Sequence, residues 1–289
     1  MSGAATWIND NVVQPIVAVL PSPYKYGGDG NDTLYGYMPA NWLYGNGGND
    51  TLIAYGATNT VDGGSGNDYL EAWGGANWMY GGSGNDTMYG YGGYNYQEGN
   101  AGNDYMEAVG GYNRQYGGSG NDTMRAYGGY NSVDAGSGDD DARAYGGYNS
   151  LDGGSGNDYL EAWGGYNSVW GGSGNDTIKA FGGGNSIYAG DGNDTVYAAG
   201  LYNSIELGSG NNWVEALGGY NSITAGAGND TVWAAGGYND IRVGSGNNTV
   251  SALGGYNYVE TGSGNDVITA GGIYNRIAAG DGTNTVTAL

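Results

Sequence analysis

The sequence predicts an all-β fold, a parallel β-roll or β-solenoid of about 15 coils, with 18 residues and two short strands in each coil. Asp or Asn recurs every 18 residues from Asp32 to Asn284, without insertion or deletion. A second series of Asn lies midway, nine residues along, from Asn41 to Asn275. Glycine-rich segments separate short runs of alternating apolar and polar residues. Such a period is typical of stacked repeats.

The composition excludes several classes of protein. With 65 glycines among 289 residues, little remains for a thick core, and the formal charge of -22 disfavours nucleic acid and anionic membranes as partners. There is no cysteine, so disulfides and thiolate metal sites are excluded. No apolar run is long enough to span a membrane, so we expect no membrane insertion.

The chain divides into residues 1–26, expected to cap the first coil or dock on another subunit, and residues 27–289, the solenoid. The apolar stretch from Val12 to Leu20 lacks a basic leading region and contains Pro15. We therefore expect an extracellular or cell-surface protein that is secreted without a cleaved N-terminal signal.

Each coil consists of two related 9-residue halves, as in residues 63–80. A glycine-rich turn leads into a strand, and the residue two places after each Asp or Asn is apolar, for example Leu70 and Met79. Because strand neighbours alternate sides, these residues point inward. Ala or Gly holds a second inward position, so the two faces lie close together, and the rod is about 70 Å long. Gln97 and Gln115 fall on adjacent coils at an inward position and are expected to bond to each other.

The segment Gly-Gly-x-Gly-x-Asp-x-apolar-x, as in Gly63–Glu71, resembles the repeats-in-toxin (RTX) nonapeptide, and the resemblance covers nearly all of residues 27–289. It implies a calcium-binding β-roll with about a dozen Ca²⁺ in the turns along one edge, enough to offset the net charge. By the same resemblance the metal ligands are Asp32, Asp50, Asp68, Asp86, Asp104, Asp122, Asp140, Asp158, Asp176, Asp194, Asp230 and Asp266.

The sequence departs from the RTX pattern at two kinds of position. Asn replaces Asp in every second half-repeat, so we expect a hydrogen-bonded Asn ladder, without calcium, along the other edge. Asn212, Asn248 and Asn284 also replace Asp on the calcium edge, which leaves the occupancy of those positions open. Without calcium the like charges repel one another, so we expect the metal-free chain to be largely unfolded.

Two files of aromatic residues accompany the Asn series. One contains Tyr94, Tyr112, Tyr130, Tyr148, Tyr166, Tyr202, Tyr220, Tyr238, Tyr256 and Tyr274, and the other contains Tyr37, Tyr55, Trp73, Tyr91, Tyr127, Tyr145, Trp163 and Phe181. Stacking along the rod is one interpretation. A contact surface for a neighbouring rod, a glycan or a cell surface is a second, compatible one.

The leading functional hypothesis is a calcium-binding extracellular structural protein that folds on Ca²⁺ and assembles head-to-tail with itself into a filament, sheath or surface layer. No enzyme is expected, because there is no His or Cys and the repeat explains the carboxylates. The alternative is an ice-binding or adhesin and glycan-binding module. The single row of calcium turns resembles that of an ice-binding RTX adhesin module, with outward pairs such as Ser65 and Asn67.

Overall fold

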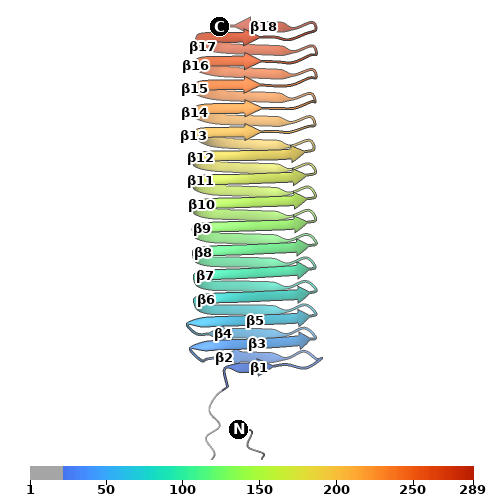
Figure 1. Cartoon of the computed structure of the whole chain (residues 1–289), viewed down its shortest axis with the longest axis vertical. Helices are drawn as coiled ribbons and strands as arrows, with labels where there is room; N and C mark the ends of the chain where they lie inside the picture. Colours follow the sequence, from blue (N-terminus) through green and yellow to red (C-terminus); the bar gives the residue numbers. More distant parts are fainter. Residues whose placement is uncertain (1–21) are drawn as a thin grey trace, which may run out of the picture.

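Each described strand pairs in parallel with strands whose partner residues lie 18 positions away, so the chain stacks coil upon coil into a straight rod (Figure 1). The computed structural model describes residues 22–289. This part of the chain contains 18 strands and no helix, and therefore no helix that could cross a membrane. The predicted all-β solenoid of about 15 coils with 18 residues per coil is confirmed.

The first strands are short, and the later ones are long. They are β1 Tyr24–Tyr26, β2 Thr33–Gly36, β3 Ala40–Gly47, β4 Thr51–Tyr55, β5 Thr58–Ser65, β6 Tyr69–Ser83, β7 Thr87–Ala101, β8 Tyr105–Ser119, β9 Thr123–Ser137, β10 Asp141–Ser155, β11 Tyr159–Ser173, β12 Thr177–Asp191, β13 Thr195–Glu206, β14 Trp213–Thr224, β15 Thr231–Arg242, β16 Thr249–Glu260, β17 Val267–Ala278 and β18 Thr285–Ala288.

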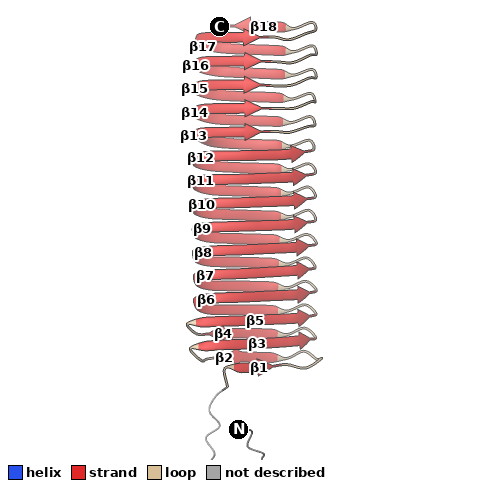
Figure 2. Ribbon diagram, viewed as in Figure 1, coloured by secondary structure: helices blue, strands red, loops and turns tan. Residues whose placement is uncertain are grey.

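The two edges of the flattened rod differ. From β6 to β17 each strand bends round one edge without a break, and this asparagine edge contains the series Asn77 to Asn275. At the other edge a glycine-rich turn separates successive strands, and this aspartate edge contains the series Asp32 to Asn284. Figure 2 shows its turns on the right. Many turn glycines, such as Gly66 with φ of 122°, adopt a backbone conformation that side chains disfavour.

The core is a thin double layer of apolar side chains. Along β6 the residues alternate in burial, so that Leu70, Ala72 and Met79 are fully buried. The same positions are buried in each coil from β4 to β16, and in β17 Ile268 and Ala270 are buried while Ile277 is partly buried. The one polar interruption is Gln97 and Gln115, and Gln115 Nε2 donates to Gln97 Oε1 at 2.7 Å. Gln97 Nε2 donates to the Glu107 carbonyl at 3.0 Å, so the predicted glutamine pair is confirmed.

The rod changes character after β12. Strands β6 to β12 extend into the turns of the aspartate edge, whereas β13 to β17 end three residues earlier, as the shorter arrows in Figure 1 show. The uniform repeat predicted from the sequence is therefore two blocks, residues 24–206 and residues 207–289.

Of the predicted N-terminal segment 1–26, residues 1–21 lie outside the described residues. Tyr24–Tyr26 form β1, which pairs with Trp42–Tyr44 of β3 in the 18-residue register.

Candidate calcium-binding edge

The aspartates predicted as metal ligands lie in one file along the aspartate edge. In each coil the Asp follows the turn, and its Oδ1 accepts a hydrogen bond from the backbone N–H of the residue one coil earlier. Asp50 N donates to Asp68 Oδ1 at 2.7 Å, and Asp140 N donates to Asp158 Oδ1 at 2.8 Å. One oxygen of each carboxylate thus connects two coils.

The second carboxylate oxygen has no donor. Oδ2 is buried and makes no hydrogen bond in Asp50, Asp68, Asp86, Asp104, Asp122, Asp140, Asp158, Asp176, Asp194, Asp230 and Asp266. Only Asp32, at the end of the file, has a partner, since Gly28 N donates to its Oδ2 at 2.6 Å. A buried carboxylate oxygen without a donor is costly unless a cation or a proton meets it.

The orphaned oxygen faces a carbonyl oxygen across a space that a glycine keeps open. A Cβ placed on Gly153, the first residue of its turn, would lie 2.6 Å from Asp158 Oδ2 and 2.5 Å from the Gly171 carbonyl oxygen. Gly63 faces Asp68 Oδ2 and the Gly81 carbonyl in the same way. Two acceptors therefore converge with no donor between them. Carboxylate and carbonyl oxygens are the ligands that Ca²⁺ prefers, so the residues present fit this metal.

No three His, Cys, Asp or Glu side chains in residues 22–289 are grouped so that they could hold a metal ion together. A cation on this edge would therefore take one carboxylate from its coil and its remaining ligands from turn carbonyls and water.

Burial in the metal-free protein raises the pKa of these carboxyl groups. The pKa rises to about 7 for Asp86, Asp122 and Asp158 and to about 6 for Asp140 and Asp176. Loss of solvation is the largest cause. The backbone N–H bond lowers the pKa, and charged neighbours in adjacent coils, such as Asp104 beside Asp86, raise it further.

These shifts predict that acid stabilises the metal-free fold. A carboxyl group whose pKa is higher in the folded protein than its unfolded value of 3.8 binds more protons in the folded state. The stabilisation that it gives to the fold is therefore complete below about pH 4 and is lost as the pH rises through about 7. In calcium-free buffer, the β-sheet signal in far-ultraviolet circular dichroism should increase as the pH falls from 8 to 5. With saturating calcium the signal should change little. A flat calcium-free titration would contradict the burial of these groups.

Asn212, Asn248 and Asn284 instead donate from their amides to carbonyl oxygens of their own turns. Asn248 Nδ2 donates to the carbonyl oxygens of Gly244 and Gly246 at 3.2 and 3.1 Å, and Asn284 Nδ2 donates to the Gly280 carbonyl at 2.9 Å. Asn212 Nδ2 reaches the Gly210 carbonyl at 3.4 Å. The amide nitrogen stands where Asp has its orphaned Oδ2, and it supplies the donor that the Asp coils lack.

The first residue of the turn also differs between the two blocks, a difference that was not predicted. It is Gly or Ala up to Ala189. In the second block it is Leu207, Val243 or Thr261 in three turns, where the side chain is buried, and Ala225 or Ala279 in the other two. Leu207 and Val243 belong to the same turns as Asn212 and Asn248, so bulky apolar side chains accompany the amides. The replacement of Gly or Ala by larger side chains in three turns after residue 206 was visible in the sequence.

A family model describes these turns. The model for the RTX calcium-binding nonapeptide repeat (4 copies) matches residues 26–38, 40–70, 70–97, 116–150, 134–169, 170–203, 207–241 and 243–272, which is more than half of the chain. The chain belongs to the RTX calcium-binding repeat family. A search of curated proteins finds no match. The RTX repeats of this chain imply a calcium-binding β-roll, and proteins with such repeats are typically secreted or extracellular.

The opposite edge of the RTX rod is the predicted Asn ladder. Asn149 Nδ2 donates to Asn167 Oδ1 at 2.8 Å and to the Trp163 carbonyl at 3.1 Å. The same bonds run from coil to coil between Asn41 and Asn275. Here every amide has both donor and acceptor partners, so this edge needs no cation.

Aromatic stacking covers the asparagine edge. Tyr130 and Tyr148 stack with ring centroids 4.9 Å apart, and Tyr148 and Tyr166 follow at 5.4 Å. In the second file Trp73 stacks on Tyr91 at 4.1 Å. The predicted stacking is confirmed for these pairs.

A second, exposed ladder was not predicted. The Asn before each Asp accepts a backbone bond from the next coil, as when Asn85 N donates to Asn67 Oδ1 at 2.7 Å. Fourteen of these bonds, with Asp139 as one acceptor, run from Asn31 to Thr283. The outward Asn of each pair considered for ice binding therefore uses its side-chain oxygen to connect successive coils.

Proposed function

We propose that this RTX chain is a calcium-dependent structural protein outside the cell, without enzymatic activity, whose rods assemble head-to-tail. The observation that carries the proposal is the file of buried Asp Oδ2 atoms facing carbonyl oxygens. Until cations reach these sites the fold contains uncompensated acceptors, and millimolar calcium is an extracellular condition. Folding on export is then coupled to metal binding.

We also propose that the number of ions follows the number of aspartates. Each of the eleven turns whose Asp Oδ2 lacks a donor would hold Ca²⁺, and Asp32 would do so if the cation displaces the Gly28 N–H from its Oδ2. The amides of Asn212, Asn248 and Asn284 would replace the ion by donating to carbonyls of their own turns.

A reciprocal pair of substitutions tests this assignment. Asp158→Asn should lower the calcium stoichiometry by about one ion, because the new amide replaces the cation. It should also stabilise the calcium-free protein, by about 1–3 kcal/mol for one orphaned acceptor removed. Asn248→Asp should destabilise the calcium-free protein by a similar amount. Native mass spectrometry and urea titration in chelator measure the two effects. Unchanged stoichiometry in Asp158→Asn would contradict an ion at that turn.

Head-to-tail assembly is supported by the way in which the coils pair. Each coil from β6 to β17 presents the same parallel strands to the next coil in the same 18-residue register. Val286 and Leu289 expose apolar surface at β18, which pairs only with β17 among residues 22–289. A coil of a second copy can continue this pairing, and such contacts do not close.

Electron microscopy tests the assembly. Negative-stain images in millimolar calcium should show filaments that disappear on chelation. Val286→Lys, which places a charge on the free edge, should shorten them while circular dichroism stays unchanged. Dispersed rods about 70 Å long in calcium, at high protein concentration, would contradict assembly and leave calcium-dependent folding standing.

A further inference from the structure

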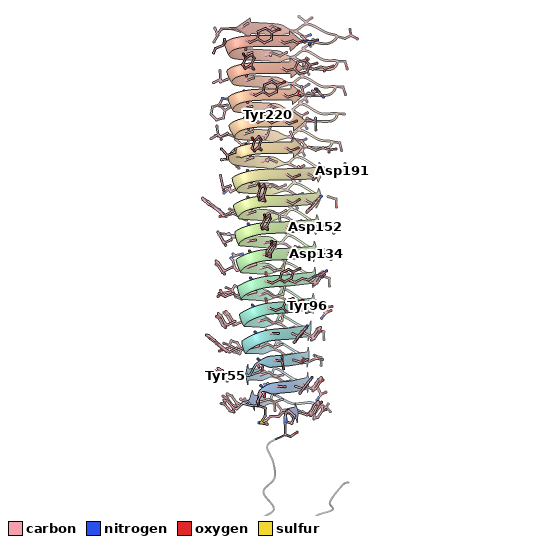
Figure 3. The ribbon with its side chains drawn as sticks, turned by 60° about the vertical axis from the view of Figure 1, so that its left-hand side comes forward. Tyr55, Tyr96, Asp134, Asp152, Asp191 and Tyr220 are labelled. Carbon is pink, nitrogen blue, oxygen red and sulfur yellow. The ribbon has the colours of Figure 1, made fainter. Side chains whose placement is uncertain are left out.

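We propose that the asparagine edge carries a binding groove for a neutral polysaccharide, centred on Gly184. The groove has a volume of about 910 Å³ and runs along seven coils of the folded rod, from β8 to β14. Binding in this groove rests on the calcium-dependent folding proposed above, but not on assembly of the rods into a filament. One wall is formed by the tyrosines of the first aromatic file, which are Tyr112, Tyr130, Tyr148, Tyr166, Tyr202 and Tyr220. In Figure 3 the asparagine edge comes forward, and Tyr220 lies at the bend of the ribbon.

The floor of the groove is a file of serines, one from each coil. They are Ser132, Ser150, Ser168, Ser186, Ser204 and Ser222. In the same register position Arg114 precedes this file and Asp240 follows it, so larger charged side chains mark both of its ends. The floor is thus small, hydroxylated and uninterrupted over the length of the groove.

Gly184 opens a notch in the tyrosine wall. It occupies the register position between Tyr166 and Tyr202. All the remaining coils from β7 to β17 have a tyrosine at this position. Tyr166 and Tyr202 are 60% and 66% exposed, the highest values among the six wall tyrosines. Within residues 22–289, Tyr202 stacks on no other ring, whereas Tyr130, Tyr148 and Tyr166 are stacked on one another. Tyr166 leans over Gly184, since a Cβ placed on Gly184 would lie 3.0 Å from Tyr166 Cδ1. The missing ring therefore leaves Tyr202 with free aromatic faces in the middle of the groove, where the apolar face of a sugar ring can pack.

The hydroxyl groups of the groove are available to a ligand. Elsewhere on the rod tyrosine hydroxyls are occupied, as in Tyr69 and Tyr159, which donate to Glu71 and Glu161 at 2.7 Å. The wall tyrosines and floor serines make no side-chain hydrogen bond within residues 22–289. Aromatic walls with closely spaced free hydroxyls suit a ligand that presents both C–H faces and hydroxyls, which is the chemistry of a saccharide chain.

Charge restricts the saccharide to a neutral one. The residues that line the groove are Tyr, Asn, Ser and Gly only, and Arg114 lies beyond the end of its floor, so no cation lines the groove to pair with an anionic sugar. Asp134 and Asp152 project beside the floor (Figure 3). These carboxylates can accept hydrogen bonds from sugar hydroxyls and repel a polyanion, as does the net charge of -22.

Affinity electrophoresis in calcium tests the groove. The native gels contain hydroxyethylcellulose, dextran or galactomannan as neutral probes, and carboxymethylcellulose as the anionic counterpart of the first. At least one neutral polysaccharide should retard the protein, and carboxymethylcellulose should retard it much less. Gly184→Tyr, which fills the notch, should weaken binding at least tenfold. Ala76→Tyr adds a tyrosine at the same register position outside the groove, and it should bind as the unsubstituted protein does.

Circular dichroism in calcium confirms that both variants fold. Retardation by none of the neutral probes, or equal binding by Gly184→Tyr, would overturn the proposal. So would sedimentation showing that Gly184→Tyr abolishes side-by-side pairing of rods without affecting retardation, because a second copy would then be the occupant. Binding by dispersed rods would support the groove even if filaments do not form.

Discussion

Removing calcium is expected to abolish most of the β-sheet signal of this RTX chain, and restoring calcium should recover it. Each buried Asp Oδ2 that faces a turn carbonyl loses its counter-charge on chelation, and neighbouring carboxylates then repel along the file. At free calcium 100-fold above the dissociation constant, each site contributes about 2.7 kcal/mol. With about a dozen proposed sites, the total exceeds the usual stability of a domain.

Far-ultraviolet circular dichroism in chelator measures this change. Magnesium at the same concentration serves as the control and should not restore the signal, because Mg²⁺ demands a tighter octahedral shell and gives up water reluctantly. A spectrum unchanged by chelation at pH 8 would contradict the coupling of folding to calcium.

The loss should not be uniform along the rod. In the second block Asn212 and Asn248 supply their own donors and Leu207 and Val243 are buried, so this block depends less on the cation. Hydrogen exchange in chelator should leave amides of β14 to β16 better protected than those of β8 to β11. Equal protection would contradict the division into two blocks.

Asn149→Asp is expected to be the most destabilising single substitution on the asparagine edge, by about 3–5 kcal/mol. Asn149 is 3% exposed, and its Nδ2 donates to both Asn167 Oδ1 and the Trp163 carbonyl. A carboxylate at position 149 would place an oxygen against Asn167 Oδ1 and the Trp163 carbonyl, both of which are acceptors. No cation site lies on this edge to compensate the negative charge. Urea unfolding in saturating calcium measures the shift.

The matched control is Asn67→Asp on the exposed ladder of the other edge. The acceptor role of Asn67 toward Asn85 N is one that a carboxylate can keep, and Asp139 already holds that position in its own coil. The expected loss is below about 1 kcal/mol. Equal losses in the two variants would show that the buried ladder does not depend on amide donors.

Much of the fold could be predicted because the signals are local and repeated. Alternation places Leu70 and Met79 inside, and the 18-residue period sets the register of the coils. The glutamine pair and the Asn ladder followed, because residues one period apart must be neighbours in a stack. The candidate metal file was predicted in the same way, by spacing and by resemblance to RTX repeats.

The rest depended on partners in neighbouring coils. Contacts of about 3 Å between atoms of the folded turns decide whether Asp158 Oδ2 has a donor. They also decide whether the Asn248 amide reaches the Gly246 carbonyl. The division into two blocks and the notch at Gly184 were visible as substitutions, but their consequences were not.

The sequence by itself determined the architecture, the inward side chains and the different chemistry of the two edges, because a short strict period makes every coil a neighbour of a near copy of itself. Only the tertiary structure decided which buried oxygens lack a donor, where an amide supplies one instead, and where the tyrosine wall opens onto free hydroxyls. These properties belong to groups from successive coils that meet only after the chain has wound round the rod.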